Sequence, residues 1–72
     1  MNTVNTELIT RLLDKRAAGN ISQKYPDLKS LFRAPFYELM DLQNVGPYKA
    51  GLLTTAFELG TKLVEELNNE HH

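Results

Sequence analysis

The chain has 72 residues and no cysteine, so it can form one domain with a small core and offers neither disulfides nor thiolate ligands for a metal. Its hydrophobic content of 42% is typical of a globular protein and excludes a disordered chain. The formal net charge of −1 argues against strong nonspecific DNA binding, because domains with that function are usually basic.

The first predicted helix starts near Asn5 or Thr6, since either side chain can cap a helix. Apolar residues at helical spacing then form one stripe: Leu8, Ile9, Leu12, Leu13 and Ala17. Gly19 is expected to end this helix, because glycine readily adopts the left-handed conformation of a helix C-terminus. Asn20 is expected to cap a short second helix that contains Ile21 and Tyr25.

Two further short helices are predicted in the middle of the chain. Asp27 is a candidate cap for the first, in which Leu28, Leu31 and Phe32 share a face. Pro35 suits the first position of the next, which carries Phe36, Leu39, Met40 and Leu42.

A break at residues 44–47 is followed by the longest predicted helix, which runs to about Leu67. Gly60 inside it would cost about 1 kcal/mol relative to alanine, so we expect the first helix to cross closely there. Phe32, Phe36 and Phe57 fall on apolar faces and are expected in the core. We predict an all-α fold, a compact bundle of about five mostly short helices in a single domain over residues 1–72, ordered over about 5–67.

The break between the last two helices has the chemistry of an anion site. Val45 is an apolar residue that can plug the space between the helices, and Gly46 permits a tight turn. Pro47 is suited to the first helical turn, so the N–H groups of Gly46, Tyr48 and Lys49 are left to face an anion such as a phosphate. Lys49 adds a positive charge beside them.

The segment 39–53 resembles a helix-hairpin-helix motif, which we place at about residues 36–57. Asn44 stands where the motif has its first glycine. Asparagine tolerates a positive φ, so the turn can form, but its side chain narrows the approach of a phosphate.

The resemblance extends to the N-terminal domain of the RadC-like family of DNA repair proteins. It is carried by the segments Glu7–Leu13, Tyr25–Leu28, Val45–Ala50 and Ala56–Gly60. The family's metalloprotease-like domain is absent from this sequence, so its metal-dependent activity is not carried over. The resemblance implies a DNA-binding module associated with repair. The chain would then be either an isolated N-terminal domain of such a protein or a short stand-alone relative.

Catalysis is not expected from this sequence. Its only histidines are His71 and His72, which we interpret as remnants of a purification tag rather than as metal ligands. The adjacent Glu65 and Glu66 would point apart on a helix and cannot form an acid–base pair. We therefore expect no enzyme activity, no cofactor and no metal site. No apolar run approaches the roughly 20 residues of a membrane span, and no signal-peptide pattern is present, so we expect a cytoplasmic protein without a membrane partner.

Two functional hypotheses remain open. In the first, the chain binds the DNA backbone weakly and without sequence specificity, through Asn44, Val45, Gly46, Tyr48 and Lys49. In the second, it keeps the fold as a protein-interaction or dimerisation module without binding DNA, and its partner is a second copy, another protein or a downstream domain. The net charge, Asn44 and the presence of only one hairpin favour the second hypothesis. We nevertheless prefer the first, nucleic-acid binding, and keep protein interaction as the alternative.

Overall fold

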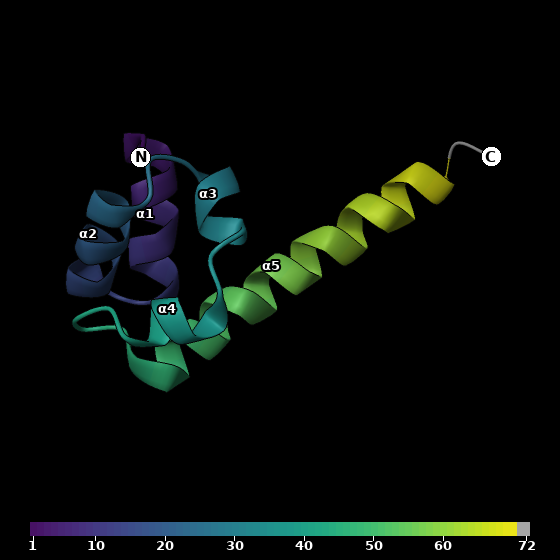
Figure 1. Cartoon of the computed structure of the whole chain (residues 1–72). Helices are drawn as coiled ribbons and strands as arrows, with labels where there is room; N and C mark the ends of the chain where they lie inside the picture. The colour runs from purple at the N-terminus through teal and green to yellow at the C-terminus, as the bar shows by residue number, and fades with distance from the viewer. Residues whose placement is uncertain (71–72) are drawn as a thin grey trace.

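The structure, a computed structural model, describes residues 1–70; the prediction for His71 and His72 lies outside the described residues. Five helices make up the described part of the chain, which confirms the all-α prediction. They are α1 (Thr3–Leu12), α2 (Lys15–Lys24), α3 (Leu28–Phe32), α4 (Phe36–Met40) and α5 (Gly46–Asn69). Helices α1 to α4 gather around the beginning of α5, and the rest of α5 extends away from them (Figure 1).

The first two helices differ from their predicted boundaries. Asn2, rather than Asn5 or Thr6, caps α1 by accepting a hydrogen bond from the Asn5 N–H at 2.8 Å. The break between α1 and α2 lies at Asp14, which caps α2 by accepting from the Ala17 N–H at 2.8 Å. The predicted break at residues 18–20 is therefore wrong.

Tertiary contacts explain why α2 continues through Gly19 and Asn20. Ala17 and Ala18 are fully buried and allow α2 to lie directly against α1. The Asn20 side chain does not cap a helix; it donates to the carbonyl of Gln43 at 2.6 Å, in the turn before α5. Continuing the helix thus buries its apolar face and satisfies a carbonyl of that turn, which outweighs the cost of an internal glycine.

The short helix α3 begins where the sequence predicts, and α4 begins one residue later than predicted. Asp27 caps α3 and forms a capping box with Ser30. Pro35 is expected to be the first residue of α4, but it is the residue that directly precedes the helix. The ring of Tyr25 is buried and its hydroxyl donates to Glu38 at 2.7 Å, so burial and this bond raise the pKa of Tyr25 to about 12.

The core lies between α1, α2, α3, α4 and the first half of α5. It contains Ile9, Ala17, Ala18, Ile21, Tyr25, Leu31, Leu39, Val45, Ala50 and Leu53. The prediction that Phe32 and Phe36 belong to it is wrong, since both side chains are exposed, Phe32 to 57%. Phe57 is partly buried against the core. Because α3 and α4 have only five residues each, each buries one side chain fully and leaves its aromatic neighbour at the rim.

The second half of α5 contacts little of the body. The expected close crossing of α1 at Gly60 is wrong: no atom of α1 lies within 4 Å of the place that a Cβ at this residue would take. This part of the helix extends into solvent, and the molecule measures 44 Å along its longest axis against 24 and 19 Å along the others (Figure 1). Within residues 1–70, no helix has both the length and the apolar character that crossing a membrane requires.

Candidate nucleic-acid interface

The turn between α4 and α5 has the backbone conformation that the sequence predicts. Asn44 has a φ of +68° and Gly46 a φ of +69°, both in the left-handed region. Val45 lies between them, is 6% exposed and belongs to the core. A buried side chain flanked by two left-handed residues holds the chain in a sharp reversal, and α5 starts immediately after it.

The beginning of α5 carries unpaired backbone donors. No hydrogen bond within residues 1–70 engages the N–H groups of Gly46 and Tyr48, and Pro47 has no N–H to satisfy. The cap residue Val45 has no side-chain oxygen to offer them. Because the helix dipole places partial positive charge at this end, the two donors favour an anion.

Lys49 is held over the turn rather than extended into solvent. Its ammonium donates to the Asn44 carbonyl at 3.0 Å and forms an ion pair with Asp14. The Ala17 N–H, and after it the Lys49 ammonium, lower the pKa of Asp14 below its ordinary value. Asp14 therefore caps α2 and neutralises Lys49 at the same time.

Two further cations border the same place. Lys15 and Arg16, at the start of α2, line a shallow hollow together with Asp14, Asn44 and Lys49; we call it the basic hollow. Both side chains are exposed, and neither forms a salt bridge within the described residues. The hollow holds three cations against one carboxylate, although the whole chain is slightly acidic.

The five predicted site residues take different positions. Asn44 and Lys49 lie together in the basic hollow, and Gly46 provides a free amide at the turn. Val45 is buried, so its role is to hold the turn. The Tyr48 side chain is highly exposed and lines a separate groove between α1 and α5, beside Leu12.

Sequence reasoning missed Lys15 and Arg16. The signal that could have found them is the run Asp14-Lys15-Arg16, in which a capping residue is followed by two cations. That signal has meaning only once the start of α2 is placed at Asp14 and α2 is known to pack beside the turn. Neither fact can be inferred if the sequence is taken to predict a helix break at Gly19.

Comparisons with protein-family models, with curated proteins and with solved structures find no match to this chain. The resemblance to the RadC-like N-terminal domain therefore stays a prediction.

Proposed function

We propose that the chain binds the phosphate backbone of nucleic acid at the turn between α4 and α5, as a helix-hairpin-helix module of the RadC-like type associated with DNA repair. The observation that carries the proposal is that the unpaired amides of Gly46 and Tyr48, at the start of α5, lie beside the cations of the basic hollow. Amides at a helix N-terminus bind a phosphate through its oxygens, and neighbouring cations add attraction that does not depend on base sequence.

Asp14 sets the strength of this contact. Its carboxylate is paired with Lys49, so an incoming phosphate must compete for the same ammonium. Lys15 and Arg16 supply the free charge. We therefore expect weak binding that neutralises about two phosphates, with the logarithm of the affinity falling by about two for each tenfold rise in salt.

An NMR titration of the ¹⁵N-labelled chain with duplex and branched DNA at low salt tests the proposal. The expected result is a cluster of shifts at the amides of Asn44 to Lys49, together with Lys15 and Arg16. A titration in which these amides do not respond, or respond no more than the rest of the chain, rejects it.

A pair of double variants tests whether DNA binds at the basic hollow or is attracted only by the net charge of the chain. Lys15→Gln with Arg16→Gln removes two free cations of the basic hollow, whereas Arg11→Gln with Lys24→Gln removes the same two residue types from α1 and the end of α2, outside the lining of the hollow. The first variant is expected to lose most of the affinity and to flatten the salt dependence, and the second to change little. Equal losses from both variants would mean that net charge alone holds the DNA.

Removing the competitor should have the opposite effect. Asp14→Asn keeps a residue that caps helices well but releases Lys49 from its ion pair. The variant is expected to bind DNA more tightly than the unmodified chain. An unchanged or weaker affinity would show that Lys49 does not face the phosphate.

Protein interaction is the second candidate, and the exposed apolar residues of α5 favour it. A chain that ignores DNA in the titration above, while its α5 amides broaden with protein concentration, would support this function instead.

A further inference from the structure

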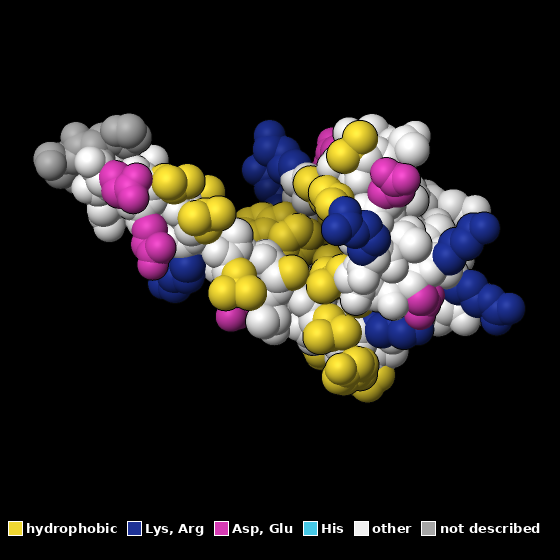
Figure 2. Space-filling model, turned by 180° about the vertical axis from the view of Figure 1, so that it is seen from behind, with side chains coloured by type: hydrophobic (Ala, Val, Ile, Leu, Met, Phe, Trp, Pro, Cys, Tyr) yellow, Lys and Arg dark blue, Asp and Glu magenta, His cyan; other side chains and the backbone are white. Residues whose placement is uncertain are grey.

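The outer half of α5, residues 56–69, has an apolar face that the chain does not cover. Leu59 is 68% exposed and Val64 is 55% exposed, and Leu63 and Leu67 are also exposed. Figure 2 shows apolar side chains that follow the protruding helix back to the body. Apolar residues at helical spacing normally face a core or a partner, so this face is built for contact.

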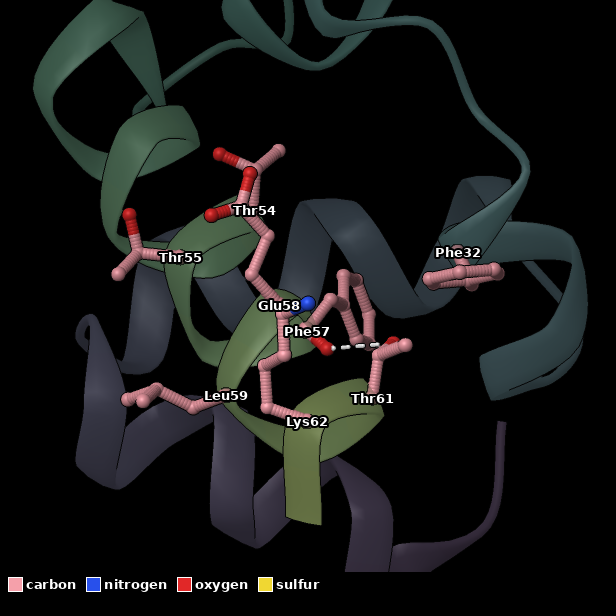
Figure 3. Close-up of a pocket in the computed structure, with 8 residues that line it drawn as sticks. All are labelled: Phe32, Thr54, Thr55, Phe57, Glu58, Leu59, Thr61 and Lys62. Carbon is pink, nitrogen blue, oxygen red and sulfur yellow. Dashed lines mark hydrogen bonds between the residues drawn. The ribbon is translucent and has the colours of Figure 1, made fainter. Parts of the chain in front are cut away.

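A groove on the same chain lies where α5 leaves the body. Phe32 of α3 and Phe57 of α5 pack edge to face, with ring centroids 5.5 Å apart. Leu28, Phe32, Phe57, Gly60 and Val64 line the groove beside this pair. In Figure 3, Phe57 lies on the side of α5 towards Phe32 and Leu59 extends from the opposite side, so both flanks of the helix present apolar groups.

The charges of the two regions are opposite in sign. Residues 1–49 contain seven basic and five acidic side chains, whereas residues 50–72 contain one basic and four acidic ones. The acidic groups gather near the end of α5, at Glu65, Glu66 and Glu70. Lys29 of α3 lines the groove, and Arg33 lies one turn further on, at the end of α3; neither forms a salt bridge within residues 1–70. Figure 2 shows acidic side chains towards the tip of the helix and most basic ones on the body.

We propose that this surface binds a second copy of the chain, with the two α5 helices antiparallel. The apolar end of each helix, around Val64 and Leu67, then lies along the partner's groove between α3 and α5. Glu65 and Glu66 of each copy come to the side where the other copy has Lys29 and Arg33. The open space at Gly60 allows the partner helix to approach the backbone closely.

A second copy is favoured over another protein because one chain carries both complementary parts, the apolar acidic helix end and the apolar basic groove. A two-fold axis then satisfies both contacts at once. The apolar side chains of this surface are between 39% and 68% exposed: Leu28, Phe32, Leu59, Leu63, Val64 and Leu67. Their exposed parts amount to roughly 500 Å² per copy, if each fully exposed side chain presents about 150 Å². Two copies would bury about 1,000 Å², near the lower limit for a specific interface, so the dimer is expected to be weak and reversible.

Sedimentation equilibrium over roughly 10 µM to 1 mM tests the association. The unmodified chain is expected to shift from monomer to dimer across this range. Val64→Gln should weaken the dimer about tenfold, which corresponds to losing the burial of one side chain. Val4→Gln is the matched control, because Val4 is 64% exposed at the start of α1, outside the groove, and it should leave the association unchanged.

A charge exchange tests the partner and the direction together. One variant carries Lys29→Glu with Arg33→Glu, and the other carries Glu65→Lys with Glu66→Lys. Each variant alone is expected to stay monomeric because like charges meet at both contacts. Mixed in equal amounts, the two should form a heterodimer, since both contacts are then restored.

Either of two results overturns the proposal. A chain that remains monomeric up to 1 mM shows that α5 has no second copy as its partner and leaves this face to a different protein. A dimer that persists in the separate charge variants, or fails to return on mixing, excludes the antiparallel arrangement. Circular dichroism of every variant keeps these readings separate from unfolding, and all substitutions are at exposed positions.

Discussion

The turn before α5 and the outer half of α5 use apolar residues in opposite ways. At the turn, Val45 is buried and its neighbours Asn44 and Gly46 adopt left-handed conformations to keep it there. Along the outer helix, Leu59, Leu63 and Val64 repeat at helical spacing without any cover from the chain itself. Apolar spacing alone therefore predicts a helix but not whether its face is filled from within the chain. The difference separates a part of the molecule that serves its own fold from a part that is free to serve another molecule.

The largest expected effect comes from removing leucine side chains in the two regions. Leu39 is fully buried just before the turn. Leu39→Ala should lower the free energy of unfolding by about 3 kcal/mol, because it leaves a cavity. Leu63→Ala should change the stability of the monomer by no more than about 0.5 kcal/mol. Urea denaturation at low protein concentration measures both. Similar losses from the two variants would mean that the outer helix is packed in solution.

Replacing a glycine by alanine in each of the two regions should change the stability by a smaller amount, and in opposite directions. Gly46→Ala forces a side chain into a φ of +69° and should destabilise the fold by about 1 kcal/mol. Gly60→Ala meets no neighbour and should stabilise the helix by roughly 0.5–1 kcal/mol. Thermal unfolding of dilute protein compares the two. A destabilised Gly60→Ala monomer would show that part of the chain does approach this glycine.

The smallest expected effect is a pH dependence that belongs to the turn region. The pKa of Asp14 is lowered in the folded chain, so the carboxylate stabilises the fold above its ordinary pKa of 3.8. This contribution is lost as the pH falls from about 4 through the lowered value. As the pH is lowered from 7 to 3, the denaturation midpoint should therefore fall less steeply for Asp14→Asn than for the unmodified chain. Identical slopes would mean that Asp14 is not engaged with Ala17 and Lys49 in solution.

Local chemistry made much of the fold predictable. The cap at Asp27, the positive φ of Asn44 and the burial of Val45 each follow from properties of one residue and its near neighbours. The start of α2 at Asp14 could not be predicted in this way, because Gly19 and Asn20 carry equally good boundary signals. The choice depends on the packing of α2 against α1 and on the bond from Asn20 to Gln43, which lies 23 positions away in sequence.

The candidate site was only partly predictable for the same reason. Asn44, Gly46 and Lys49 are close in sequence, so the turn brings them together whatever the rest of the chain does. Asp14, Lys15 and Arg16 join them only through the packing of α2. The exposure of Phe32 was missed because its apolar neighbours suggested a full core, whereas a helix of five residues has too short a face to bury two large side chains.

The length of α5 has a geometric consequence for the pair of chains that we propose. If two α5 helices cross near residues 61–62, each turn lies about 15 residues, or roughly 23 Å, from the crossing point. The two basic hollows would then be roughly 45 Å apart, a separation of about 13 base pairs along a duplex. The length of α5 would set this separation, and two weak contacts on one DNA molecule would reinforce each other only where the duplex can reach both.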